Sequence, residues 1–262
     1  MIHPSYTCRP ELQALLTEVY GYPHFRDLEI YQDLSQGRQT TWLSQGALIE
    51  HAVQEAEKAL QGQHPDNLLL TAPTGSGKSL LFQLPAIYLG REQGVLTLVV
   101  SPLKALIVDQ VESLQEQGYD RVAYASSDLS PEQKVEAYRR VREGEVDLFY
   151  LSPELLLAYD IHRFIGNRRI GLVVIDEAHT VTTWGKEFRV DYWFLGRYLR
   201  GLKQALGYDF PLFALTATAV WNPRETTTWC LRRSVPCRWT LVYSISALSV
   251  ATISASISVR CR

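Results

Sequence analysis

The chain has 262 residues, a formal net charge of −2 and 46% hydrophobic residues. This hydrophobic fraction argues against wholesale disorder, and 16 glycines and 12 prolines are too few for a collagen-like or low-complexity chain. The balance of 26 basic against 28 acidic residues excludes a protein that is strongly basic overall, although a local basic groove would be enough to bind nucleic acid. The length accommodates one large domain or two small ones.

The first 65 residues are expected to form a mostly helical N-terminal extension, in which the apolar spacing of 43–61 predicts an amphipathic helix. From residue 66 onward, strand and helix patterns alternate. We expect strands at 67–71, 95–101, 122–125, 147–151, 171–175 and 211–216, and helices at 79–89, 105–117 and 131–143. Strands that recur with helices between them predict an α/β fold, with a parallel sheet flanked by helices and ligands at the carboxyl ends of the strands.

The last part of the chain differs from the rest in composition. Residues 226–262 hold five arginines and no Asp, Glu, Lys or Gly. One interpretation is translation in the wrong frame from about residue 220 onward, another is a small genuine appendage, and a third is a membrane span at 241–259. Seven Ser or Thr among those 19 uncharged residues make the span weakly hydrophobic. We therefore expect 220–262 to be an atypical tail, either frameshifted or disordered.

The cysteines and the N-terminus indicate the cellular setting. Cysteines at 8, 230, 237 and 261 form no CxxC pair, which argues against a zinc site or a redox motif. Early His, Glu and Arg residues, with no apolar core segment, predict that there is no signal peptide. We expect a reduced, cytoplasmic protein without a membrane partner.

A glycine-rich segment, TAPTGSGKS at 71–79, lies between a predicted strand and a predicted helix, which is the context a phosphate-binding loop requires. Glycines let backbone N–H groups turn toward phosphate oxygens, and the next helix offers its positive end. Lys78 would neutralise phosphate charge and the Ser79 hydroxyl would bind Mg²⁺. The other expected nucleotide contacts are Thr74, Gly75, Ser76 and Gly77. Ala72 replaces the first Gly of the simple GxxxxGK[ST] pattern, and the alternative is a turn that binds nothing.

A second motif follows the strand predicted at 171–175, where the sequence continues Asp176-Glu177-Ala178-His179. Adjacent carboxylates at a strand end are costly unless a cation or solvent meets them. Beside a phosphate loop, Asp176 would hold Mg²⁺ through water, and Glu177 would orient and deprotonate the attacking water. The alternative is a solvated strand end with a capping acid.

Together these motifs resemble the superfamily 2 helicases in their DEAH form, and most closely the RecQ-like DNA helicases. The segment VVSPLKAL at 99–106 resembles that family's motif Ia, and YLSPEL at 150–155 resembles its next DNA-side motif. The segment ALTATA at 214–219 resembles motif III, which couples hydrolysis to strand movement in the family. Most specific is WGKEFR at 184–189, which resembles the aromatic-rich loop that senses single-stranded DNA. The resemblance extends over roughly residues 20–219.

The resemblance implies a RecA-like P-loop domain at 66–219, with ATP and Mg²⁺ as cofactors and DNA as partner. It also implies 3′-5′ translocation and unwinding in the complete enzyme. The implied DNA-binding or coupling residues are Ser101, Pro102, Lys104, Trp184, Phe188, Arg189, Thr216 and Thr218. Trp184 and Phe188 offer faces for bases and Arg189 offers a cation, while the alternative is that both aromatics belong to the core.

The family also uses a glutamine that reads adenine, for which Gln45 is the candidate here, although it lies farther before Lys78 than is usual. Thr180, Thr183 and Lys186 replace residues common in the family and indicate a divergent member.

A complete helicase of this type has a second RecA-like lobe, for which the residues after 219 are too few. We therefore expect no unwinding by this chain alone, unless a separately encoded second lobe joins it. Two alternatives stay open: a nucleic-acid- or partner-binding module without turnover, and an RNA helicase of the same superfamily. The aromatic loop argues against the RNA helicase.

Overall fold

The structure is a computed structural model that describes residues 8–31, 40–72, 75–178, 190–217, 238–243 and 258–260. Of these, residues 30, 31, 40, 190–194, 238–243 and 258–260 are described by their backbone alone.

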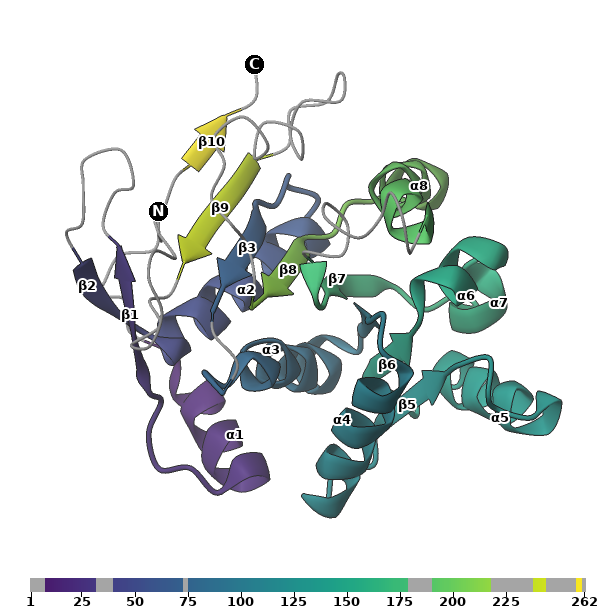
Figure 1. The fold of residues 1–262 in the computed structure, drawn as a ribbon, viewed down its shortest axis with the longest axis horizontal. Coiled ribbons are helices and arrows are strands. Elements are labelled where there is room, and N and C mark those ends of the chain that lie inside the picture. Colours follow the sequence, from purple (N-terminus) through teal and green to yellow (C-terminus); the bar gives the residue numbers. More distant parts are fainter. Residues whose placement is uncertain are drawn as a thin grey trace.

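An eight-stranded sheet of order β10-β9-β3-β8-β7-β4-β6-β5 runs through the described part of the chain (Figure 1). Neighbouring strands from β9 to β5 pair in parallel, and β10 pairs antiparallel with β9. The strands are β3 (Asn67–Thr71), β4 (Leu96–Val100), β5 (Val122–Ala125), β6 (Leu148–Leu151), β7 (Ile170–Ile175), β8 (Leu212–Thr216), β9 (Arg238–Tyr243) and β10 (Ser258–Arg260). The parallel α/β fold predicted from the alternating pattern is confirmed.

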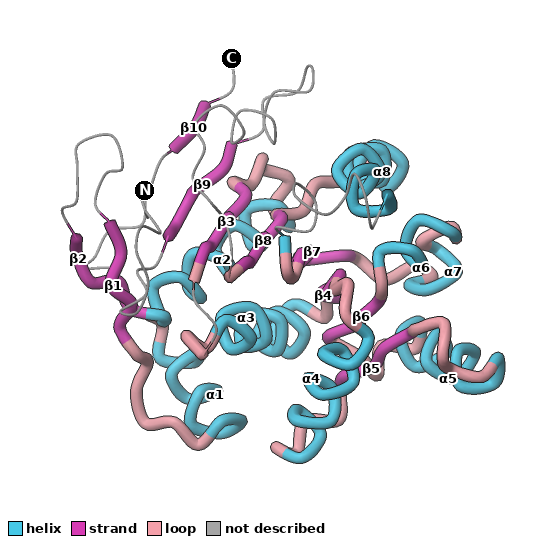
Figure 2. The backbone as a smooth tube through the Cα atoms, viewed as in Figure 1, coloured by secondary structure: helices cyan, strands magenta, loops and turns pink. Residues whose placement is uncertain are grey.

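Helices cover both faces of this sheet (Figures 1 and 2). The helices on one face are α1 (Pro10–Tyr20), α2 (Gln45–Leu60), α3 (Lys78–Gln93) and α4 (Lys104–Glu116), which share one hydrophobic cluster with that face. The helices on the other face are α5 (Pro131–Arg142), α6 (Pro153–Ala158), α7 (His162–Ile165) and α8 (Val190–Leu206), and the side chains described there form a second cluster. Strand β4 contributes Val99 to the first cluster and Leu98 and Val100 to the second, as the alternation of side chains along a strand requires.

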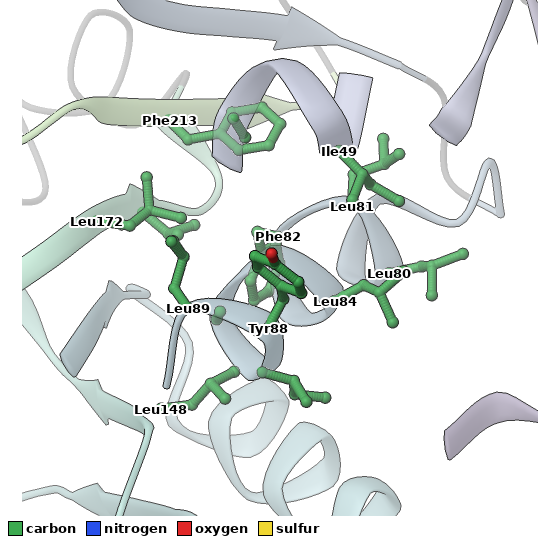
Figure 3. Close-up of a cluster of buried hydrophobic side chains, with 14 of the residues drawn as sticks. Ile49, Leu80, Leu81, Phe82, Leu84, Tyr88, Leu89, Leu148, Leu172 and Phe213 are labelled. Atoms are coloured by element: carbon green, nitrogen blue, oxygen red, sulfur yellow. The ribbon is translucent and has the colours of Figure 1, made fainter. Parts of the chain in front are cut away.

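Helix α3 is the central helix of the first face. Its residues 80–90 are all buried, because α3 lies between the sheet and the helices α1 and α2. Figure 3 shows its side chains among Ile49, Leu148, Leu172 and Phe213. A helix enclosed on all sides has no polar stripe, so an amphipathic pattern is absent here. This burial fixes the start of α3, and therefore Lys78, relative to the strand ends.

The N-terminal extension contains strands as well as helices. Between α1 and α2, strands β1 (Asp27–Tyr31) and β2 (Thr40–Ser44) pair antiparallel as a two-stranded hairpin. The expectation of a mostly helical segment did not include this hairpin. Its strands, DLEIY and TTWLS, mix polar and apolar side chains and lack the apolar runs that mark β3 and β5.

Within the described residues, no helix is long and apolar enough to cross a membrane. Of the stretch 241–259, residues 241–243 lie in β9 and 258–259 in β10, and the rest lies outside the described residues.

Candidate functional site

The predicted chemical residues gather at one edge of the sheet, where the parallel strands end. Lys78 begins α3 just after β3, and Asp176 follows β7 directly. Ser101 follows β4, and Thr216 ends β8. Because β3, β8, β7 and β4 are parallel neighbours, their carboxyl ends lie side by side (Figure 1). The topology thus brings the glycine-rich loop and the acidic pair together.

The loop before α3 takes a conformation that depends on glycine. Gly75 and Gly77 have φ values of 83° and 78°, in the left-handed region that glycine adopts without strain. Ala72 is fully buried, and its N–H donates to Thr216 O at 3.0 Å. Its position where the simple pattern has Gly is therefore compatible with this backbone. Thr74 lies outside the described residues.

Lys78 points back into this loop, where its Nζ donates to Ala72 O at 2.9 Å. Burial lowers the pKa of Lys78, while the charges of Glu177 and Asp176 act in the opposite direction. The ammonium group therefore shares an electrostatic environment with both carboxylates, as the two motifs together predict.

Asp176 is a buried carboxylate, with 6% of the residue exposed. Its Oδ1 accepts the Glu177 N–H at 2.9 Å, and its Oδ2 accepts a long hydrogen bond from Ser101 Oγ at 3.5 Å. Burial and the neighbouring Glu177 raise the pKa of Asp176 to about 6, although Lys78 and the two hydrogen bonds oppose the shift. The partners in this structure only partly compensate the buried charge, as expected for a group that is completed by a bound cation.

Glu177 has a backbone φ of 49° and is the one non-glycine residue with positive φ in the described part of the chain. A glutamate in this region is strained by about 1–3 kcal/mol, and such strain is found mainly at functional sites. The strained residue is the one that the acidic motif predicts to activate water.

Two hydroxyl groups of the loop are buried without a hydrogen-bond partner among the described residues, Thr71 Oγ1 and Ser76 Oγ. Buried polar atoms are normally paired, and these two lie in the segment that is expected to bind phosphate. Together with the ammonium of Lys78, they fit a polyanion. The oxygens of Asp176 and Ser79 fit a hard cation such as Mg²⁺.

Gln45 lies against the loop in spite of its distance along the sequence. It is the first residue of α2 and is 2% exposed. Its Nε2 donates to Ser76 O at 2.9 Å, and its Oε1 accepts the Arg26 N–H at 3.2 Å. The structure therefore places this candidate beside the loop.

The DNA-side candidates differ in exposure. Ser101 and Thr216 are 1% and 2% exposed, and Pro102 is also buried. Lys104 is exposed, and its Nζ donates to Asp128 Oδ1 at 2.7 Å and also to Ser127 Oγ. Four further candidates lie outside the described residues: Trp184, Phe188, Arg189 and Thr218.

Two polar contacts at this edge were not anticipated from the sequence. Asp128, which pairs with Lys104, lies in a loop without a recognisable motif. Gln83 lies in the buried stretch 80–90 of α3 and bonds Tyr20 and Tyr150, and its isolated amide in an apolar run is the signal that could have revealed this contact.

Comparisons with known proteins agree with this geometry. Residues 50–226 match the family model described as DEAD/DEAH box helicase. The ATP-dependent DNA helicase RecQ of Synechocystis sp. is 36% identical over 213 residues, which cover 80% of this chain and 38% of that protein. RecQ of Haemophilus influenzae is 33% identical over 211 residues, which cover 80% of this chain and 28% of that protein. The chain thus spans well under half the length of these relatives.

Solved structures support the fold. A crystal structure of the DUF1998 helicase MrfA bound to DNA has a TM-score of 0.54 at 20% identity, and the match covers 87% of this chain and 29% of that one. Loop geometry, acidic pair, family match and sequence identity agree, and the chain belongs to the DEAD/DEAH box helicase family as a RecQ-like member.

Proposed function

We propose that residues 66–219 form the ATP-binding lobe of a RecQ-like DNA helicase, in which ATP hydrolysis drives 3′-5′ translocation and unwinding in the complete enzyme. The observation that carries this proposal is the convergence of Lys78, Asp176 and Glu177 at the carboxyl edge of the sheet. Residues 1–65 would then be an N-terminal extension that supplies Gln45, and 220–262 an atypical tail.

In this proposal Lys78 and the N–H groups of Gly75, Ser76 and Gly77 hold the phosphates. Ser79 and Asp176 would hold Mg²⁺, which neutralises phosphate charge when bound. Glu177 orients the attacking water and accepts its proton. The phosphate oxygens would also give the orphaned hydroxyl of Ser76 a partner.

Gln45 is proposed to read the adenine base. Its amide has one N–H bonded to Ser76 O and one oxygen lone pair bonded to Arg26 N–H. A primary amide has two N–H groups and two acceptor sites, so one of each is left for the base. The two existing bonds hold the amide in a fixed orientation for that contact.

On the DNA side, we propose that Lys104 contacts the phosphate backbone and that Ser101, Pro102, Thr216 and Thr218 couple the nucleotide site to the DNA. Trp184 and Phe188 would stack on bases, with Arg189 as a neighbouring cation. This assignment rests on the resemblance of WGKEFR to the loop by which RecQ-like helicases sense single-stranded DNA.

The 262-residue chain by itself is expected to bind Mg·ATP weakly, to hydrolyse it slowly and not to unwind DNA. In the family a second lobe supplies arginine fingers, and such residues can contribute about 10³–10⁵ in rate in P-loop enzymes. A separately encoded lobe would be the partner that completes the site.

Nucleotide binding and ATPase assays with and without single-stranded DNA test the proposal. We expect DNA-stimulated turnover that is lost in Lys78→Ala and kept in Lys58→Ala, a control on α2 that pairs with Glu55. DNA binding that is indifferent to ATP and to Lys78 would instead identify a module without turnover. Preference for RNA in a competition assay would identify an RNA helicase.

A further inference from the structure

A chain of hydrogen bonds crosses the first face of the sheet, from the partly buried Tyr20 of α1 through Gln83 of α3 to Tyr150 of β6. The Tyr20 hydroxyl donates to Gln83 Oε1 at 2.9 Å, and Gln83 Nε2 donates to the Tyr150 hydroxyl at 3.0 Å. Gln83 is 5% exposed and Tyr150 is fully buried. Both ends of the amide are therefore occupied, and its orientation is fixed.

The polar groups of these hydrogen-bonded side chains are not required for packing. Gln83 lies in the stretch 80–90 of α3, in which every residue is buried, and Tyr150 packs edge-to-face on Phe82 with ring centroids 6.4 Å apart. Leucine and phenylalanine would fill the same space without the free energy of desolvating an amide and a hydroxyl. What the polar pair adds is a directional link between α1, α3 and the sheet.

Tyr150, at the inner end of this series of hydrogen bonds, lies near Asp176, the acid that is proposed to bind Mg²⁺. In the strand register, Val99 of β4 is level with Tyr150 on one side and Val174 on the other. Past the end of β7, the Asp176 N–H donates to Val100 O at 2.9 Å, and Asp176 Oδ2 accepts from Ser101 Oγ at 3.5 Å. The N–H of Ser101 donates to the carbonyl of Leu151, the residue after Tyr150, at 3.1 Å. The charge of Asp176 contributes, after burial, to raising the pKa of Tyr150. In its hydrogen bond with Gln83 the Tyr150 hydroxyl is the acceptor, so this bond does not use the hydroxyl's own proton.

Tyr20, at the outer end of this series of hydrogen bonds, belongs to a segment that also contacts the phosphate loop. Tyr20 is the last residue of α1, and its ring stacks on Tyr22 with centroids 6.4 Å apart. Six residues later, the backbone of Arg26 exchanges two hydrogen bonds with Gln45, which bonds Ser76 O. Residues 20–26 therefore connect to the nucleotide site on two sides.

We propose that Tyr20, Gln83 and Tyr150 are positioning residues that link the docking of α1 to the placement of Asp176 for Mg²⁺-bound nucleotide. The inference rests on the proposed function and adds a role for the N-terminal extension. The residues touch neither nucleotide nor metal, and they act through β6, whose Leu151 carbonyl holds Ser101, the residue that donates to Asp176. Loss of a link should weaken the part of nucleotide binding that depends on Mg²⁺.

The test measures the Kd of a fluorescent ATP analogue for the full chain, with Mg²⁺ and with EDTA. In Tyr150→Phe we expect the ratio of the EDTA Kd to the Mg²⁺ Kd to fall about fivefold, the effect of one neutral hydrogen bond, with the EDTA Kd unchanged. In Tyr20→Phe, one link farther away, we expect a fall of about twofold. Tyr22→Phe is the matched control, an exposed tyrosine beside Tyr20, and should behave as wild type.

The outcomes separate this inference from the proposed function. An unchanged ratio in both Tyr150→Phe and Tyr20→Phe, or equal weakening with and without Mg²⁺, would overturn the positioning role. If Tyr150→Phe does not fold, as judged by circular dichroism, Tyr20→Phe at the partly buried end decides alone. Asp176→Asn tests the metal site itself: if it keeps the full Mg²⁺ dependence, the proposed function fails, whatever the tyrosines do.

Discussion

The sheet holds one buried carboxylate near each of its two ends, Asp147 before β6 and Asp176 after β7. At the amino end, Asp147 is fully buried and accepts from Tyr119 Oη at 2.5 Å, from Arg121 Nε at 2.7 Å and from Arg121 NH2 at 2.8 Å. At the carboxyl end, Asp176 has one short hydrogen bond and one long one. The first acid accepts three short hydrogen bonds from side chains, whereas the second accepts one long bond from a side chain and so keeps unused acceptor capacity.

The residues around the two acids differ in the same way: those near Asp147 are well paired, and those near Asp176 are less so. At the amino end, Gly90 leaves space for Asp147, since a Cβ there would lie 2.3 Å from its Cγ, and Arg168 is held by the carbonyl groups of Val141, Val146 and Gly94. At the carboxyl end, Glu177 has a strained backbone, and the hydroxyls of Thr71 and Ser76 have no hydrogen-bond partner among the described residues. The ion pair and its supporting hydrogen bonds thus lie at the amino end, and the proposed catalytic residues lie at the carboxyl end.

The largest expected effect is on catalysis. Glu177→Gln should lower single-turnover ATP hydrolysis by about 10²–10⁴-fold, because the amide cannot accept the proton of water. Binding of Mg·ATP and the melting temperature should stay near wild type, since Glu177 is not part of the core. Glu143→Gln, an exposed glutamate after α5, is the control. Hydrolysis within threefold of wild type would remove Glu177 from the site.

The next effect is on stability and tests the amino end. Asp147→Asn should lower the free energy of unfolding by about 3–5 kcal/mol, because Arg121 and Tyr119 lose a buried charged acceptor. Urea unfolding monitored by circular dichroism measures the change. Asp120→Asn, which alters an exposed acid at the same end, should change stability little. A mild effect at Asp147 would show that this ion pair is not a main source of stability.

The two ends also differ in how far the sequence predicts them. The motifs at the carboxyl end are contiguous, so Lys78, Asp176 and Glu177 can be proposed as site residues from short segments. Parallel strands are apolar runs, and 67–71 and 122–125 were predicted with the observed bounds, because both faces of such a sheet are buried. These features depend on local pattern alone.

Other features depend on contacts between distant segments and could not be predicted. The bonds of Asp147 to Tyr119 and of Gln83 to Tyr150 span 28 and 67 residues, and no local pattern announces them. Gln45 can be proposed from the sequence in spite of an unusual spacing, but its contact with Ser76 depends on where α2 begins. Helix α8 was not predicted, since Gly196 and Gly201 interrupt its pattern.

A smaller effect of opposite sign is expected at the carboxyl end. The pKa of Asp176 is raised to about 6 from 3.8, so folding favours the protonated form, and the ionised form destabilises the fold. This destabilisation begins as pH rises above 3.8 and is complete above about 6. In EDTA, Asp176→Asn should therefore raise the free energy of unfolding at pH 7.5 by about 2–3 kcal/mol and leave it unchanged near pH 4.

Urea unfolding at the two pH values decides this prediction. Stabilisation at Asp176 and destabilisation at Asp147 by the same Asp→Asn change would establish the contrast between the two ends. If Asp176→Asn destabilises at both pH values, the carboxylate contributes to the fold much as Asp147 does, and the contrast is lost.

The smallest effect concerns an exposed acid at the carboxyl end, Asp128, which follows β5 and pairs with Lys104 at 2.7 Å. The hydrogen bond from Lys104 lowers the pKa of Asp128, so the Asp128 carboxylate is charged at neutral pH and screens the lysine. Asp128→Asn should free Lys104 for phosphate and tighten single-stranded DNA binding about two- to threefold at low salt, with the gain lost at high salt. Fluorescence anisotropy at two salt concentrations measures both.

Asp120→Asn is the matched control for this change, since Asp120 precedes the same strand at the opposite end of the sheet. Both substitutions raise the net charge by one, so a general electrostatic effect on DNA would appear in both. A gain confined to Asp128→Asn, and absent in Asp128→Asn combined with Lys104→Ala, would place the DNA at the carboxyl edge beside Lys104. Equal gains from both acids would show that DNA senses only the overall charge, and the DNA-side assignment of Lys104 would fail.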